Sequence, residues 1–219
     1  MMNHSDTKST DTFQQSLQPI LVNREREKDL LSVCPHRDVT DEIVCIAFSN
    51  ETKTLVDRKI ATDHSMTGEE ILDRAIQNQM QNPYHLSSIE EMLGLNTEIA
   101  PSSLMVLTNN RAFCGSSEAL NQTAMDEAAN KLKSDKLFVI PSSVHEVLLF
   151  PENGGVSPNQ FNELINSINQ NEVKPQDRLA NRVMLYDKKT HRLADAEEML
   201  NEEISPEKQL PSPERKHHI

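Results

Sequence analysis

The sequence contains no tryptophan, and it has only 5 glycines and 3 cysteines in 219 residues. No two glycines form a Gly-x-Gly pair, which argues against the phosphate-binding loops of the common nucleotide folds. The cysteines are odd in number, and a chain of this length can bury a core without disulfides. These scarcities disfavour a nucleotide fold and a disulfide-bonded secreted domain, and they favour a reducing, cytoplasmic location.

Basic charge is also scarce. The chain has 22 Lys and Arg against 34 Asp and Glu, a net charge of −12, and aromatic residues make up 4% of it. A nucleic-acid binder shows a basic surface with stacking aromatics, so we expect no direct binding to nucleic acid. No apolar run approaches the roughly 18 residues that span a bilayer, and the start of the chain shows no signal peptide. We therefore expect no membrane association.

The hydrophobic residues are fewer than in an average globular chain but sufficient for folding. They make up 36% of the sequence, and Leu, Ile, Val and Phe alone make up 24%. Wholly disordered chains fall below about 20% on the second measure. Because polar residues dominate both ends, we expect disordered tails over residues 1–17 and 204–219 and a single domain over residues 18–203.

Five short apolar runs in the middle of the chain have the length of strands. Their hydrophobic positions are continuous rather than alternating, which is typical of strands covered on both faces. The runs span residues 43–48, 104–107, 137–140, 147–150 and 183–186, and a weaker candidate spans residues 54–60. Pro141–Glu146 is too short for a crossover helix, so the two strands that it joins are predicted to pair antiparallel.

Helical patterns separate these runs. Thr67 and Glu70 form a capping-box pair ahead of an apolar stripe that reaches Met80. Further helices are predicted over residues 88–93, from 116 or 117 to 131, and from 158 to 168. Together the elements predict an α+β fold, with one mixed sheet of about five strands packed against three to four helices.

The densest group of chemically active side chains is Pro141-Ser142-Ser143-Val144-His145-Glu146. A Ser–His–Glu triad is one interpretation, but in an extended segment Ser143 and His145 share a face and Glu146 points to the other. A Gly-x-Ser-x-Gly nucleophile elbow is also lacking. We favour a turn in which the serines bond to local backbone, and contact with a ligand or partner is the remaining alternative.

Cys114 is a further candidate nucleophile, because it follows a predicted strand and precedes a predicted helix, and a thiol near a helix N-terminus can have a lowered pKa. His145 is the one obvious base for it. The Asn109-Asn110 pair is predicted to make the intervening turn, since Asn tolerates left-handed backbone angles. No cofactor and no metal site are predicted, because Leu149 stands where a His-Glu-x-x-His helix needs its second histidine, and no Cys-x-x-Cys pair exists.

Three segments of the chain, Ile20–Phe48, Leu107–Leu120 and Leu137–Pro151, carry a family resemblance. With residues 66–92 and 173–187 they resemble a bacterial family of unknown function, found in Gram-positive anaerobes and often beside mobile-element genes. The likeness covers about residues 18–190, and its signature is Pro-Ser-Ser-x-His-Glu. More distantly, the order of elements is similar to a second uncharacterised bacterial family with an α+β fold. The resemblance implies a fold and a genetic setting, and no activity.

Three functions follow as hypotheses, with an enzyme less favoured than a non-enzyme. The leading one is a non-catalytic interaction or accessory protein of a mobile element, with an unidentified protein partner. The second is a hydrolase-like enzyme that uses His145 with Ser142, Ser143 or Cys114 as nucleophile. The third is an acidic mimic of nucleic acid that blocks a DNA-binding enzyme, which would need a stripe of carboxylates on one face. The oligomeric state is left open.

Overall fold

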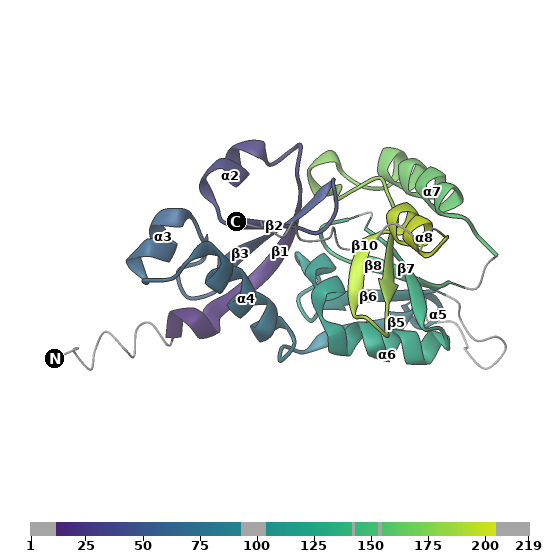
Figure 1. Cartoon of the computed structure of the whole chain (residues 1–219), viewed down its shortest axis with the longest axis horizontal. Coiled ribbons are helices and arrows are strands. Elements are labelled where there is room, and N and C mark those ends of the chain that lie inside the picture. The colour runs from purple at the N-terminus through teal and green to yellow at the C-terminus, as the bar shows by residue number, and fades with distance from the viewer. Residues whose placement is uncertain (1–11, 93–103, 142, 153–154, 205–219) are drawn as a thin grey trace, which may run out of the picture.

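The structure is a computed structural model, and it describes residues 12–92, 104–141, 143–152 and 155–204. The described chain forms two antiparallel sheets that lie side by side, each with its own helices (Figure 1). The smaller sheet comes from the N-terminal part of the chain, and the larger sheet comes from the rest.

The smaller sheet has the order β1-β3-β2, with β4 paired to β3. Its strands are β1 (Leu17–Asn23), β2 (His36–Asp38), β3 (Ile43–Ser49) and β4 (Thr54–Leu55). β1 pairs with β3 along its whole length, from Leu17 opposite Ser49 to Asn23 opposite Ile43. The helices of this lobe are α2 (Lys28–Val33), α3 (Arg58–Asp63) and α4 (Gly68–Gln79).

Helix α4 starts where the sequence predicts. The Thr67 hydroxyl accepts a hydrogen bond from the Glu70 amide, and the Glu70 carboxylate accepts one from the Thr67 amide at 2.8 Å. This reciprocal cap satisfies two backbone donors that a helix start otherwise leaves unpaired. Ile71, Leu72 and Ala75 are buried on the side of α4 that packs against β1 and β3.

The larger sheet has the order β10-β9-β7-β8-β6-β5. Its strands are β5 (Tyr84–Ser88), β6 (Met105–Asn109), β7 (Lys136–Ile140), β8 (Val147–Pro151), β9 (Met184–Asp187) and β10 (Arg192–Asp195). The accompanying helices are α5 (Ile89–Met92), η1 (Gly115–Leu120), α6 (Gln122–Leu132), α7 (Pro158–Asn171), η2 (Pro175–Asp177) and α8 (Ala196–Ile204), of which η1 and η2 are 3-10 helices.

The continuous apolar runs are explained by helices on both faces of this sheet. In β7, Leu137 and Val139 belong to the same core cluster as the α6 residue Ala128. Phe138 and Ile140, which alternate with them, belong to a second cluster. This cluster contains Phe161 of α7 and Ala196 and Met199 of α8. Each face of the strand therefore needs apolar side chains, which removes the alternation seen in a half-exposed strand.

The predicted α+β class is confirmed, and so is the antiparallel pairing of β7 with β8. The prediction of one mixed sheet of about five strands is wrong, because the structure has two sheets in which every pairing is antiparallel. The strands that contain proline or many polar residues, such as β1 with Pro19, β5 and β10, were not predicted from the sequence. These strands lie at sheet edges, where burial on both faces is not required.

Three local predictions also differ from the structure. Residues 12–16 are helical and Phe13 is fully buried, so order begins before the expected residue 18. The weak candidate over residues 54–60 contains only the short β4, since Asp57 caps α3 by accepting from the Ile60 amide at 2.7 Å. The helix predicted from 116 or 117 to 131 is broken at Asn121, whose side chain caps α6.

The C-terminal tail lies outside the described residues, apart from Ile204 at the end of α8.

A single core cluster connects the two lobes. It contains Leu21 and Ile71 from the first lobe together with Leu107, Ala124 and Val139 from the second. Helix η1 lies at this junction, because it contacts β1 and α4 on one side and β6, β8 and α6 on the other. No helix in the described part of the chain has the length and apolar character needed to cross a membrane.

Candidate functional site

The predicted cluster at Ser143–Glu146 lies in the connection from β7 to β8, beside the start of η1. Ser143 is buried, and its hydroxyl accepts a hydrogen bond from the backbone amide of His145 at 2.9 Å. It also forms an isolated antiparallel bridge with Arg178. This serine therefore forms the local turn that the sequence analysis favoured.

The His145 ring has a polar group near each of its nitrogens. Its Nδ1 accepts a hydrogen bond from the Cys114 amide at 3.3 Å, and its Nε2 lies 3.6 Å from Asp177 Oδ1. Because Nδ1 acts as acceptor, Nε2 carries the proton and faces the carboxylate. The ring also lies 5.5 Å from the Phe113 ring, centroid to centroid. The structure thus joins three loops through one imidazole.

Cys114, His145 and Asp177 are brought together, but the thiol is not activated. Burial raises the pKa of Cys114, and the nearby Asp177 raises it further. Among the described residues no hydrogen bond joins the thiol or the Ser143 hydroxyl to the imidazole. The nitrogen that a nucleophile would need as base is used by a backbone amide instead.

Two further candidates add little to this cluster. Glu146 is half-buried and has no ion pair or hydrogen bond to another described side chain. Ser142 lies outside the described residues. Within the described ranges, no three His, Cys, Asp or Glu side chains gather in a way that could hold a metal ion.

The loop from Asn109 to Cys114 is tightly built. The Asn109 side chain accepts a hydrogen bond from the Arg111 amide at 3.0 Å and donates one to the Phe113 carbonyl at 2.9 Å. The predicted turn is therefore present, but Ala112 and Cys114, and not the asparagines, adopt the left-handed backbone angles. The result is that Phe113 is 66% exposed on a loop fixed at both ends.

Gly115 allows this loop to pack against the sheet. A Cβ atom at this position would lie 2.2 Å from Thr108 Oγ1 and 2.6 Å from the His145 carbonyl oxygen. The same two groups bond to each other, because the Thr108 hydroxyl donates to the His145 carbonyl at 2.7 Å. A side chain at residue 115 would displace both of them.

A polar recess lies next to this loop, between β1 and the residues that lead into η1. Part of it has a volume of about 160 Å³ and is lined by Gln18, Gln79, Asn82, Pro83, Asn109, Asn110, Arg111 and Glu118. An adjoining part of about 90 Å³ shares four of these residues and also reaches Phe113 and Cys114. We call the two parts together the η1 recess.

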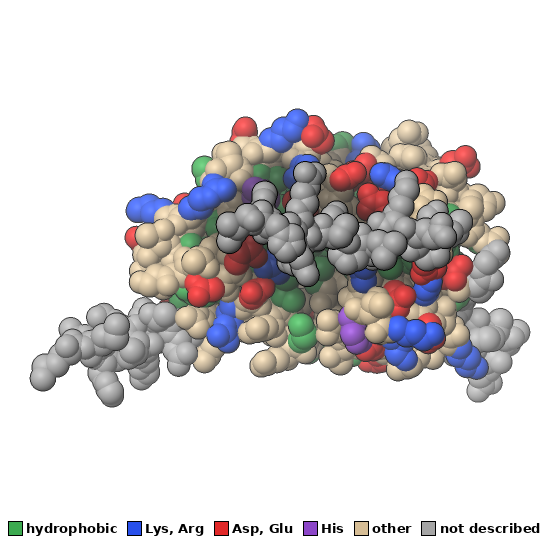
Figure 2. All heavy atoms as spheres, viewed as in Figure 1, with side chains coloured by type: hydrophobic (Ala, Val, Ile, Leu, Met, Phe, Trp, Pro, Cys, Tyr) green, Lys and Arg blue, Asp and Glu red, His purple; other side chains and the backbone are tan. Residues whose placement is uncertain are grey.

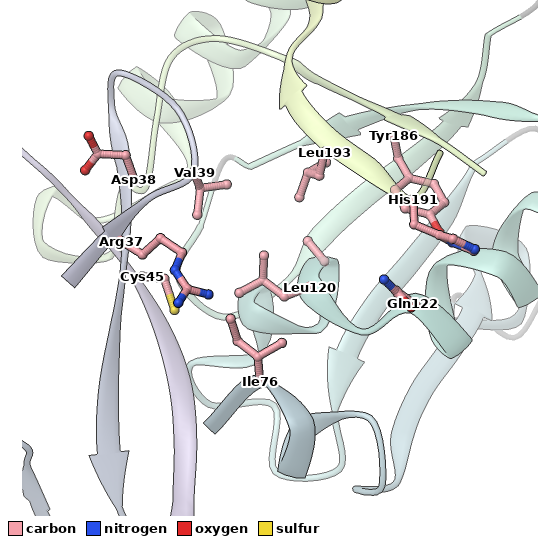
Figure 3. A pocket seen from close by; sticks show the side chains of 11 residues that line it. Arg37, Asp38, Val39, Cys45, Ile76, Leu120, Gln122, Tyr186, His191 and Leu193 are labelled. Atoms are coloured by element: carbon pink, nitrogen blue, oxygen red, sulfur yellow. The ribbon is translucent and has the colours of Figure 1, made fainter. Parts of the chain in front are cut away.

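A second cavity, which we call the Arg37–Tyr186 cleft, lies between the two lobes and has a volume of about 220 Å³. Figure 3 shows the Arg37 guanidinium at one end and Tyr186 and His191 at the other, with Ile76 and Leu120 between them. The polar groups at both ends are already paired. Arg37 bonds to Asp73 at 2.8 Å and to Glu69, and the Tyr186 hydroxyl donates to Asp126 at 2.8 Å.

Burial of the Tyr186 ring raises the pKa of its hydroxyl, and the bond to Asp126 raises it further, so this phenol stays neutral. Neither cavity was predicted from the sequence. Their residues come from segments far apart in the chain, and such convergence leaves no local motif. Glu118 gave no signal in the sequence, because it lies off the apolar stripe that Leu120 and Ala124 begin in the predicted helix.

In its described residues the chain is an α+β protein of two antiparallel sheets, with a polar recess of about 160 Å³ beside η1 at their junction. Residues 1–188 match the model of the family of unknown function DUF5688, and the chain belongs to this family. The predicted membership of a family of unknown function is thus confirmed, while the bacterial source, the signature and the mobile-element setting stay predictions. No curated protein and no solved structure matches the chain significantly.

Proposed function

We propose that the chain is a non-catalytic interaction protein that serves a mobile genetic element, and that Phe113 is central to its contact surface. The observation that carries the interaction is the exposure of Phe113 on a loop that hydrogen bonds hold in place. Exposed aromatic side chains on rigid supports are typical anchors of protein interfaces, because little conformational entropy is lost on binding. The mobile-element setting rests on the family resemblance alone.

The groups around Phe113 support binding rather than catalysis. The His145 ring, the Ser143 hydroxyl and the Thr108 hydroxyl are all used in contacts that fix the loop. The chain also has a net charge of −12, which favours association with a basic partner. We therefore expect a protein partner that offers an apolar pocket with basic residues around it.

Site-specific photo-crosslinking tests this proposal. A photoreactive phenylalanine analogue at residue 113 is expected to capture one dominant partner in host cells, and the same analogue at Val33, which is 51% exposed, is the matched control. The purified partner should then bind Phe113→Ala at least about tenfold more weakly than the wild type. Equal crosslinking at both positions, or unchanged affinity of the variant, would reject the role of Phe113.

A hydrolase is the second candidate function, because Cys114, His145 and Asp177 converge in the order Cys–His–Asp. It requires the imidazole to exchange its bond with the Cys114 amide for one with the thiol. Hydrolysis of activated esters that is lost in both Cys114→Ser and His145→Ala would establish it. Activity that persists in Cys114→Ser would exclude this nucleophile.

The acidic-mimic hypothesis finds less support. On the face shown in Figure 2, acidic and basic side chains of the described residues are interspersed rather than sorted into a stripe. Several acidic side chains of the described residues also pair with basic ones, as in the 2.6 Å contact of Arg24 with Asp38 and the 2.8 Å contact of Lys131 with Glu127. A face of this kind does not resemble the regular phosphates of a duplex.

A further inference from the structure

Glu118 is an acidic side chain that the fold buries completely. It lies in η1, its exposed fraction is 0%, and one of its oxygens, Oε2, accepts a hydrogen bond from the Asn121 side chain at 3.0 Å. The other oxygen, Oε1, is equally buried and has no hydrogen-bond partner in the described residues. The Gln79 side chain approaches the carboxyl and favours its charged form, but it does not complete a bond of ordinary geometry to Oε1.

An unpaired buried oxygen is costly, by about 1–3 kcal/mol for a neutral group and more for a charged one. Folded proteins pair almost all such atoms, and the exceptions are often functional. Glu118 also lines the η1 recess, so this buried carboxylate lies in the wall of a cavity and is not wholly enclosed by closely packed core. A donor placed in that cavity would supply the bond that the protein lacks.

The wall of the recess is rich in amides. Gln18, Gln79, Asn82 and Asn110 contribute side-chain amides that can both donate and accept, and Asn109 adds an amide that already bonds within its own loop. The volume of about 160 Å³ is smaller than the roughly 300–1,000 Å³ of sites for drug-sized ligands. About five water molecules occupy this volume in liquid water. A small, strongly polar molecule fits this space, and a nucleotide or a folded peptide does not.

Arg111 supplies the opposite charge. It lines both parts of the recess, and its guanidinium forms no ion pair with a described acidic residue. Its backbone is fixed, because its amide donates to the Asn109 side chain at 3.0 Å. The recess therefore presents an unpaired cation from an exposed residue and an unpaired acceptor from a buried one.

We propose that the η1 recess binds a small zwitterion of the free amino acid class, with its ammonium group on Glu118 Oε1 and its carboxylate on Arg111. The ammonium group gives the buried carboxylate the partner that it lacks, and a guanidinium is suited to a carboxylate because it can donate two parallel hydrogen bonds. The amides orient the remaining polar atoms. This site does not depend on the proposed role of Phe113 in partner binding.

Protonation adds a second, independent expectation. Burial raises the pKa of Glu118 to about 7. The charge of Glu118 acts on Tyr84 of β5, which bonds to Glu127 of α6, and Arg111 of the loop lines the same recess. The bond to Glu127 and burial raise the pKa of Tyr84 to about 12, so Tyr84 stays neutral between pH 6 and pH 8. An ammonium ligand needs the ionised carboxylate, and its affinity should therefore rise about tenfold from pH 6 to pH 8.

Calorimetric titration of the full chain with a matched ligand set tests the proposal. The zwitterions are glycine, alanine, serine, glutamine, β-alanine and 4-aminobutyrate. N-acetylglycine lacks the ammonium group, and glycinamide lacks the carboxylate. At least one zwitterion is expected to bind at least tenfold more tightly than both of these blocked compounds. If no zwitterion binds, or if glycinamide binds as tightly as glycine, the assignment is wrong.

Two variants test the contacts. Glu118→Gln and Arg111→Gln should each weaken the binding zwitterion at least tenfold, and Glu118→Gln should also abolish the rise between pH 6 and pH 8. The matched controls are Glu163→Gln and Arg74→Gln, which remove exposed charges outside the recess and should leave the affinity unchanged. A folded Glu118→Gln variant that binds as the wild type would overturn the proposal. Photo-crosslinking at residue 113 should be unaffected by either recess variant, which separates this result from the proposed function.

Discussion

We call the contacts of His145 with Cys114, together with the Ser143 and Thr108 hydrogen bonds beside them, the His145 joint. The His145 joint and the η1 recess lie against the same short 3-10 helix, but they differ in whether their polar groups have partners. At the joint, the ring Nδ1, the Ser143 hydroxyl and the Thr108 hydroxyl all form hydrogen bonds, and the ring Nε2 lies 3.6 Å from Asp177 Oδ1. In the recess, Glu118 Oε1 and the Arg111 guanidinium have none among the described residues. A histidine or serine whose polar atoms are used in contacts within the fold has a structural role. An unpaired polar group beside a cavity is available to a ligand.

The substitution expected to destabilise the His145 joint most is Gly115→Ala. The added methyl group would overlap Thr108 Oγ1 and the backbone oxygen of His145, so the loop must move away from the sheet. Overpacking of a core typically costs about 1–3 kcal/mol, and a clash with backbone places this variant at about 3 kcal/mol or more. Urea denaturation should show that loss, and the exposed α6 substitution Thr123→Ala should stay within about 0.5 kcal/mol of the wild type. A stable Gly115→Ala protein would show that the joint is looser than its contacts imply.

In the recess, ionisation of Glu118 should make the free energy of unfolding depend on pH. The pKa of Glu118 is about 7 in the folded protein and 4.5 in its unperturbed state, so the folded chain holds a proton that the unfolded chain has released. The contribution of Glu118 to stability is then largest below pH 4.5 and is lost as the pH rises from 4.5 to 7. Relative to the wild type, Glu118→Gln should gain about 2–3 kcal/mol between pH 5 and pH 8. Parallel urea titrations of the two proteins and of Glu163→Gln measure this, and a constant difference across pH would contradict it.

Two substitutions of His145 separate the effect of its hydrogen bond from the effect of its ring packing. His145→Ala removes the acceptor of the Cys114 amide and should destabilise the fold by about 1–2 kcal/mol, the range for losing the partner of a partly buried donor. His145→Asn, whose side-chain oxygen can accept from that amide, should recover part of the loss. Thermal unfolding of the two variants distinguishes these cases. Equal destabilisation by Ala and Asn would mean that ring packing, and not the hydrogen bond, fixes the loop.

The smallest effect on stability is expected at Phe113. Because its side chain is 66% exposed, Phe113→Ala should change the free energy of unfolding by no more than about 0.5 kcal/mol. The same variant is the one expected to lose the protein partner. A large loss of stability would instead assign the ring a packing role beside His145, through the 5.5 Å contact of the two rings.

The parts of the fold that the sequence predicted are those determined by local physics. The capping box at Thr67 and the apolar runs of β3, β7 and β8 lie where their patterns placed them. β1 and β5 were missed because an edge strand tolerates Pro19 or a run of polar residues. The division into two sheets was missed because pairing between distant strands leaves no periodic trace in the sequence.

The candidate site shows the same limit. The sequence located Ser143 and His145, but their hydrogen bonds decide between a triad and a turn, and those bonds depend on Cys114 and Asp177 in other segments. Glu118 was hidden by its position in a predicted helix that breaks at Asn121. Only the three-dimensional arrangement shows that its side chain borders a cavity.

The core cluster that runs from Leu21 and Ile71 to Leu107 and Val139 has a thermodynamic consequence. Two lobes with separate cores melt as separate units, whereas lobes that share one core lose their packing together. Scanning calorimetry should therefore record one transition whose calorimetric and van't Hoff enthalpies agree. A lesion in either sheet would then lower the melting temperature of the whole molecule, and the chain would behave as one folding unit despite its two sheets.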